Sequence, residues 1–137
     1  MVATRQFGDR AYSVLVTDDD RGSRDAIASV LADRGFVART AESGEEAIEI
    51  VRVNAIDLLV FDQHMPRMTV LEALQQVRVF NATLPALLVT ADPTRDVLRL
   101  ASLAQVYSVI PKPVNANILL HMLRRALNTV YGQPLPE

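Results

Sequence analysis

The sequence predicts an α/β protein in which a five-stranded parallel sheet is flanked by five helices. Short apolar runs alternate along the chain with amphipathic segments of helical period. The runs at Val14–Val16, Leu58–Phe61 and Ala86–Val89 are continuously apolar, as expected for strands buried on both faces. Strands and helices in strict alternation form a parallel sheet with helices on both sides.

The first helix is predicted between the first two strands in the sequence. We expect a strand at Tyr12–Thr17, and a helix that begins at the polar residue Asp20 and ends before Gly35. Phe36–Ala38 is predicted as a short second strand.

The remaining elements follow from the same two patterns. Ser43 and Glu46 have the Ser-x-x-Glu spacing of a capping box, so a second helix is expected to begin there and to end near Asn54. Further strands are predicted at Leu58–Phe61, Ala86–Val89 and Val106–Ile110. The helices after them are predicted from apolar residues at helical spacing: Val70, Leu71, Leu74 and Val77; Val97, Leu100, Ala101 and Ala104; and, behind the N-cap candidate Asn115, Leu119, Leu120, Leu123 and Leu127.

The composition of the chain excludes several classes of function. The 137 residues, 50% of them hydrophobic, suffice for one globular domain with its own core. The chain has no cysteine, which excludes disulfides, thiolate metal sites and thiol catalysis. Neither a signal peptide nor a membrane-spanning run is found, so we expect a cytoplasmic protein with no membrane contact. The net charge of −2, the scattered arginines and the few aromatic residues argue against direct nucleic-acid binding.

Acidic side chains follow two predicted strands at the edge where such sheets bind ligands. Asp18 and Asp19 directly follow the first strand, and Asp62 directly follows the third. If these strands are neighbours, the three carboxylates converge and resist ionisation unless a cation neutralises them. Oxygen ligands without thiolate suit Mg²⁺, which is therefore the expected cofactor.

Two further polar residues belong to the same edge. Thr90 ends the fourth strand and Lys112 follows the fifth. Three carboxylates and one ammonium carry a formal charge of −2, which Mg²⁺ would neutralise, so that the pocket could admit an anion. Asp62 is then the candidate in-line nucleophile for a phosphoryl group. The Thr90 hydroxyl would donate to a phosphoryl oxygen, and Lys112 and the metal would spread the charge.

Four segments at successive strand ends resemble the receiver domains of bacterial two-component response regulators: VLVTDDDRGSRDAIASVLADRGF, DLLVFDQHMPRM, LLVTAD and IPKPV. Each motif alone is weak, but the ordered set is highly specific. The resemblance covers residues 12–130, between an N-terminal tail at 1–11 and a C-terminal tail at 131–137. It implies the flavodoxin-like (βα)5 fold of the chemotaxis receivers, with strand order 2-1-3-4-5.

The resemblance also implies roles for single residues. Asp18 and Asp19 match the acidic pair that holds the metal, Asp19 more directly. Asp62 matches the phosphoacceptor, which also binds the metal, and the backbone carbonyl of His64 would complete the protein ligands.

The same resemblance covers the last strands and shows one departure. Thr90 matches the switch hydroxyl, Lys112 matches the lysine that binds the phosphoryl group, and the Lys112–Pro113 peptide is expected to be cis. Most receivers carry an aromatic residue three positions before the lysine, where this chain has Val109. Alternation along a strand predicts Tyr107 on the same face as Val109. We expect either that Tyr107 substitutes for the missing aromatic residue or that coupling runs through the loop after Thr90 alone.

Two loops also differ from the family pattern. Val70 stands where a small residue is usual, and Gln105-Val106 stands where Gly-Ala is usual, so both loops are expected to be rebuilt. A left-handed turn is not expected at Val70, because a β-branched residue tolerates positive φ poorly.

The expected function is two-component signalling. A sensor histidine kinase or phosphotransfer protein would donate a phosphoryl group to Asp62, and the altered shape would control a partner. Only self-phosphorylation and self-dephosphorylation are expected, so the chain is not predicted to be an enzyme. No output domain follows Glu137, so the output is expected through a downstream protein or a removed effector domain. The last two strand–helix units, which similar domains use to dimerise, are a candidate homodimer surface.

Three alternatives stay open. The chain could be a pseudo-receiver that binds a protein partner without phosphorylation or metal. An aspartyl-phosphate phosphatase of the haloacid-dehalogenase kind needs an acid two residues after the nucleophile, where this chain has His64, and a cap insertion that is not found. A flavodoxin-like cofactor binder would need a phosphate-binding glycine loop and flanking aromatic residues, which the sequence does not show.

Overall fold

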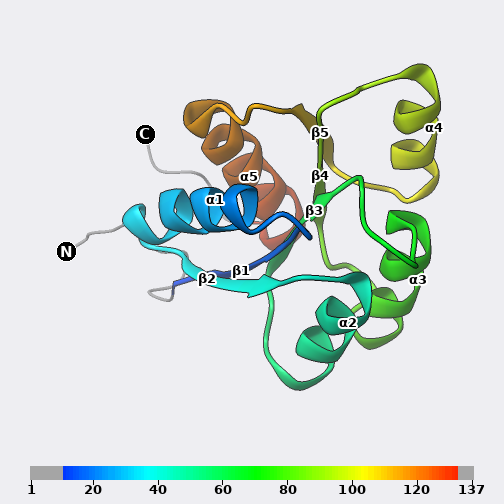
Figure 1. The fold of residues 1–137 in the computed structure, drawn as a ribbon. Coiled ribbons are helices and arrows are strands. Elements are labelled where there is room, and N and C mark those ends of the chain that lie inside the picture. The colour runs from blue at the N-terminus through cyan, green and yellow to red at the C-terminus, as the bar shows by residue number, and fades with distance from the viewer. Residues whose placement is uncertain (1–10, 133–137) are drawn as a thin grey trace.

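The structure, a computed structural model, describes residues 11–132 (Figure 1). Within these residues, five strands alternate with five helices, as predicted. The elements are β1 (Ser13–Thr17), α1 (Arg21–Asp33), β2 (Val37–Ala41), α2 (Gly44–Val53), β3 (Leu58–Asp62), α3 (Val70–Phe80), β4 (Ala86–Thr90), α4 (Arg95–Leu103), β5 (Ser108–Pro111) and α5 (Ala116–Tyr131).

The five strands form one parallel sheet in the order β2-β1-β3-β4-β5, which confirms the predicted order. Its register brings the strand ends together. Thr17 of β1 pairs with Phe61 of β3, so the next residues, Asp18 after β1 and Asp62 at the end of β3, lie side by side. Strand β3 thus includes Asp62, one residue beyond the predicted end at Phe61. Asp62 pairs in turn with Val89 of β4.

Helices α1 and α5 lie on one face of the sheet, and α2, α3 and α4 lie on the other (Figure 1). Two layers of apolar side chains fill the space between the sheet and these helices. Alternate residues of β3 face opposite layers: Leu59 and Phe61 pack with α2, α3 and α4, whereas Leu58 and Val60 pack with α1 and α5. All residues of β3 and β4 are buried, as expected for central strands covered on both faces. This burial fixes the register, because a slip by one residue would reverse the facing of every side chain.

Each helix begins at a side chain that accepts a hydrogen bond from the first turn: Asp20, Ser43, Thr69, Thr94 and Asn115. The starts predicted at Asp20, Ser43 and Asn115 are confirmed. The predicted capping box is half formed, because the Glu46 carboxylate accepts from the amide of Glu42 instead of that of Ser43. A complete capping box, with both hydrogen bonds, occurs instead at Thr69 and Glu72, which have the same spacing but were not predicted to form one.

The two unusual loops bend at residues with positive φ. Val70 is the first residue of α3 and is not left-handed, in agreement with the prediction. Arg67, three residues earlier, has φ 70°, and Gln105, after α4, has φ 54°. Neither residue is glycine, so packing around each loop must offset the conformational cost.

The prediction that Tyr107 and Val109 share a face is wrong. Strand β5 begins only at Ser108, so alternation does not extend back to Tyr107. Val109 packs on the layer of α2, α3 and α4, whereas Tyr107 packs on the layer of α1 and α5. Hydrogen bonds to Thr129 and Arg125 of α5 lower the pKa of Tyr107. Tyr107 therefore does not occupy the position of the missing aromatic residue.

The last helix continues one residue beyond the predicted domain end at Val130. The Tyr131 hydroxyl donates to the carbonyl of Asp57 at 2.8 Å, and its ring centroid lies 5.4 Å from that of Tyr12. These contacts attach the end of α5 to the starts of β1 and β3. Residues 1–10 and 133–137 of the predicted tails lie outside the described residues. Within residues 11–132, no helix is long and apolar enough to cross a membrane.

Replacing Tyr131 by Phe should lower the free energy of unfolding by about 1 kcal/mol, because it removes the hydrogen bond to Asp57 but keeps the ring contact. Urea unfolding followed by circular dichroism measures the change. His121→Ala, at an exposed position of the same helix, is the control. Equal stability of Tyr131→Phe and the wild type would contradict this role of the hydroxyl.

Candidate functional site

The candidate site lies where the loops after β1, β3 and β5 meet. Asp18 and Asp62 are buried, with 1% and 5% of their surfaces exposed, and Asp19 is exposed. One carboxylate oxygen from each of the three lies within 4.8 Å of the others. The structure therefore brings together the three acidic residues that the sequence predicts as a cluster.

Asp18 is held by several contacts. Its Oδ1 accepts from the backbone amide of Asp20 at 2.9 Å, and its backbone carbonyl accepts from Nη1 of the buried Arg24 at 2.8 Å. Its own amide donates to the carbonyl of Ala41 at the end of β2. Asp20 itself caps α1, so the third acid of the run has a structural role.

Lys112 reaches the cluster from the end of β5. Its Nζ lies 2.9 Å from Oδ1 of Asp62 and 3.1 Å from Oδ2 of Asp18. The Lys112–Pro113 peptide is cis, which confirms that prediction. Burial opposes the charge of Lys112, but hydrogen bonds to the two carboxylates outweigh this effect and raise its pKa.

Asp62 carries its charge at a cost. Burial raises the pKa of this carboxyl, the hydrogen bond from Lys112 lowers it, and the charges of Asp18 and Asp19 raise it again, so that the net change is upward. One ammonium group does not balance three carboxylates. A further cation among these oxygens would relieve the repulsion.

Thr90 lies beside this cluster but is not hydrogen-bonded to it. Its buried hydroxyl accepts from the backbone amide of Asp92 at 3.0 Å and donates to Oε1 of Gln63 at 3.4 Å. Gln63 directly follows Asp62 and was not predicted as a site residue. The sequence feature that could have indicated a role for Gln63 is its polar amide side chain directly after the candidate nucleophile.

The loop that carries His64 is fixed against α2. His64 is exposed, two residues after Asp62. Further along the loop, Arg67 lies 3.4 Å from the carboxylate of Glu45. Met68 packs so closely on Gly44 that a Cβ there would lie 2.9 Å from its sulfur. These contacts stabilise a single conformation of the loop, although Arg67 has a positive φ.

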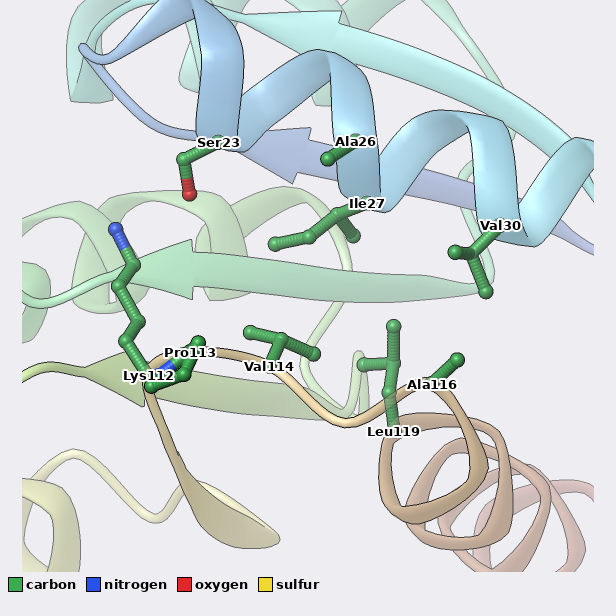
Figure 2. Close-up of a pocket in the computed structure, with 9 residues that line it drawn as sticks. All are labelled: Ser23, Ala26, Ile27, Val30, Lys112, Pro113, Val114, Ala116 and Leu119. Carbon is green, nitrogen blue, oxygen red and sulfur yellow. The ribbon is translucent and has the colours of Figure 1, made fainter.

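An apolar groove of about 290 Å³ runs from Lys112 between α1 and the start of α5. Figure 2 shows the Lys112 side chain at one end of the groove, pointing toward Ser23 of α1. Ile27, Val114 and Leu119 line the remainder. Apolar contact area is thus available directly beside the acidic cluster.

Comparison with known proteins identifies the family. Residues 14–124 match the model of the response regulator receiver domain. The chain belongs to this family. Response regulator MprA of Mycobacterium sp. strain KMS is 36% identical over 127 residues, which are 90% of this chain and 54% of that protein. The MprA protein of Mycobacterium ulcerans strain Agy99 is 37% identical over 117 residues, 83% of this chain and 49% of the relative. The receiver chain spans about half the length of these curated relatives.

Solved structures agree on the receiver fold. A receiver domain protein from Methanospirillum hungatei JF-1 matches with a TM-score of 0.84 at 22% identity, covering 91% of this chain and 100% of that chain. The chemotaxis protein CheY4 of Vibrio cholerae matches with a TM-score of 0.81 at 27% identity, covering 85% of this chain and 99% of that chain.

The acidic cluster fits the metal that receiver domains bind. Its donors are carboxylate oxygens, which Mg²⁺ prefers, and they are crowded enough to need a cation. Lys112 contacts Asp18 and Asp62, while Asp19 is exposed to solvent. The chemistry of this donor set is therefore compatible with a hard divalent cation.

Replacing Asp62 by Asn should stabilise the metal-free protein, by about 1 kcal/mol near neutral pH, because a buried and repelled charge is removed. The raised pKa means that the ionised form is disfavoured by folding. The wild type is therefore fully stable below the ordinary Asp pKa and loses stability as pH rises through the raised value. Urea unfolding in EDTA, from about pH 4 to pH 7, should show a gain for Asp62→Asn that grows with pH.

Asp25→Asn is the matched control for that series, because Asp25 is an exposed acid on α1 outside the cluster. Its stability should stay parallel to the wild type across the pH range. A loss of stability for Asp62→Asn, or a gain that does not change with pH, would contradict the electrostatic account of the cluster.

Proposed function

We propose that this receiver domain accepts a phosphoryl group on Asp62 in a Mg²⁺-dependent reaction and changes conformation in response. The observation that carries the proposal is the ion pair between Lys112 and Asp62 within the cluster formed with Asp18 and Asp19. A nucleophilic carboxylate, a fixed cation and a place for a metal are the groups that in-line phosphoryl transfer needs.

In the proposed transfer, an Asp62 carboxylate oxygen attacks the phosphorus of a phosphohistidine. The new O–P bond forms as the N–P bond of the donor breaks, and the electron pair of that bond returns to the imidazole of the donor. Lys112, which already contacts Asp62 and Asp18, pairs with an oxygen of the incoming phosphoryl group. Thr90 turns its hydroxyl toward another phosphoryl oxygen.

Asp18, Asp19 and Asp62 would hold the metal, with the backbone carbonyl of His64 as a further oxygen ligand. When bound, Mg²⁺ supplies positive charge that offsets the charge of the phosphoryl oxygens. The contacts of Asp18 with Asp20 and Lys112 keep its carboxylate in place, and the exposure of Asp19 leaves it accessible as the more direct ligand.

The proposed phosphodonor is a sensor histidine kinase or a phosphotransfer protein. The groove beside Lys112 supports this proposal, because a docked donor could cover the accessible apolar side chains of Ala26, Val30 and Val114 next to the acceptor. The proposed output is a downstream protein or an effector domain, and the relatives of about twice the length are compatible with the second form. A homodimer through α4, β5 and α5, a cytoplasmic location and the absence of nucleic-acid contact stay predictions.

Multiple-turnover catalysis is not part of the proposal. His64 occupies the position where a haloacid-dehalogenase-like phosphatase needs its second acid, so only self-phosphorylation and self-dephosphorylation are expected. The pseudo-receiver is the principal alternative. It differs from the proposal in needing neither Mg²⁺ nor a modified Asp62.

Incubation with acetyl phosphate and Mg²⁺ should add the mass of one phosphoryl group, because Asp62 is the carboxylate paired with Lys112. Intact-mass spectrometry measures the adduct. Asp62→Asn or excess EDTA should abolish it, and Asp25→Asn, outside the cluster, should keep it. An unmodified wild-type chain under all these conditions would contradict the proposal and favour the pseudo-receiver.

Mg²⁺ should raise the unfolding temperature progressively with the logarithm of its concentration above Kd, since binding to the folded state adds about 3 kcal/mol at a hundredfold excess over Kd. Asp19→Asn should weaken the apparent affinity by about tenfold, equivalent to 1.4 kcal/mol. Differential scanning fluorimetry measures both effects. Asp33→Asn, at the exposed end of α1, is the control. Equal Mg²⁺ affinity of Asp19→Asn and the wild type would remove Asp19 from the ligand set.

A further inference from the structure

The Thr90 hydroxyl is held by two neighbours that are not part of the acidic cluster. It accepts from the amide of Asp92 at 3.0 Å and donates to Oε1 of Gln63 at 3.4 Å. Thr90 is fully buried at the end of β4, and Gln63 is the hydrogen-bond acceptor that its hydroxyl reaches in this arrangement. Gln63 Oε1 accepts the hydrogen bond that this hydroxyl donates.

The position of Gln63 is set by the sheet. Its backbone amide donates to the carbonyl of Val89 at 2.8 Å, which continues the β3–β4 pairing one residue beyond Asp62. Val89 directly precedes Thr90. The partly buried Gln63 amide is therefore fixed next to the hydroxyl by the strand pairing that also fixes the nucleophile.

A hydroxyl has one proton and can donate to one acceptor at a time. While Thr90 donates to Gln63, it cannot donate to a phosphoryl oxygen on Asp62. The distance of 3.4 Å lies beyond the preferred range for such a bond, so the contact is weak and can be exchanged readily. A weak hydrogen bond to Gln63 therefore favours one orientation of the Thr90 hydroxyl but still allows the hydroxyl to turn.

We propose that Gln63 is a positioning residue that holds the Thr90 hydroxyl in its resting orientation and thereby sets how readily the chain adopts the phosphorylated conformation. The inference rests on the proposed phosphorylation of Asp62 and adds to it the residue that regulates Thr90. It concerns the residue after the nucleophile, to which the sequence motifs assigned no role.

The same residue links the site to α4. Gln63 and Leu100 of α4 line one cavity of about 290 Å³, together with His64 and Met65 of the β3–α3 loop. When Thr90 turns away, the Gln63 amide loses its partner beside this cavity. A movement of the Gln63 amide would thus be passed to Leu100 of α4, which lines the same cavity. This route does not need an aromatic side chain at position 109, where this chain has Val109.

The first test compares Gln63→Met, which keeps the length of the side chain but removes the acceptor, with the wild type. The phosphoryl adduct from acetyl phosphate should form about twofold to fivefold faster, within the range expected for the net strength of one hydrogen bond. In a Thr90→Val background, the same substitution should have no effect on the rate, because the hydroxyl through which Gln63 acts is absent.

A second readout needs no phosphorylation. The amide of Asp92 donates to the Thr90 hydroxyl at 3.0 Å, so release of that hydroxyl in Gln63→Met should accelerate the exchange of this amide proton, measured by NMR, by a similar factor. Gln63→Glu retains an acceptor oxygen and should restore the wild-type exchange rate. In the Thr90→Val background, Gln63→Met should leave Asp92 exchange unchanged.

The outcomes separate this inference from the proposed function. If the wild type forms no adduct, the proposed function fails, and the exchange of Asp92 still tests whether Gln63 holds Thr90. If the adduct forms but Gln63→Met changes neither its rate nor Asp92 exchange, the inference is overturned. It is also overturned if Gln63→Met has the same effects with and without the Thr90 hydroxyl.

Discussion

The crowding of three carboxylates around one lysine is the constraint on which the site depends. Asp18, Asp19 and Asp62 lie within 4.8 Å of one another, and Lys112 contacts two of them. Burial and mutual repulsion keep the pKa of Asp62 high, so the metal-free cluster is electrostatically unfavourable. The fold can maintain it because the apolar layers on both faces of the sheet fix β1 and β3 in register. The core thus enforces an arrangement of carboxylates that a cation would stabilise.

Much of this could be predicted from the sequence, because alternation and strand ends are local patterns. Continuous apolar runs gave the buried strands, and acids after two of them gave the cluster, once parallel strands were known to end at one edge. The contact between Thr90 and Gln63 could not be predicted in this way. It depends on a side-chain orientation across two paired strands, and glutamine after a strand has many ordinary explanations.

Tyr107 shows how a local pattern fails. The prediction extended strand alternation to a residue that precedes β5, and the chain there still follows the turn after Gln105, with its positive φ. Tyr107 therefore packs against α5 while Val109 packs under the other layer. Strand boundaries are the least certain part of a pattern-based prediction, and alternation assigns faces only to residues that lie within the strand.

The loops around the site are held to different extents, and this difference indicates where a conformational change can occur. The β3–α3 loop is attached to α2 through Arg67 and through Met68 on Gly44, whereas residues 91–96, at the start of α4, are all exposed. The other end of α4 is fixed by Arg78 of α3, which donates to the carbonyls of Ala104 and Gln105. A change at Thr90 therefore meets the least resistance at the start of α4. Of the two routes expected from the sequence, coupling through the loop after Thr90 is the one that these contacts favour.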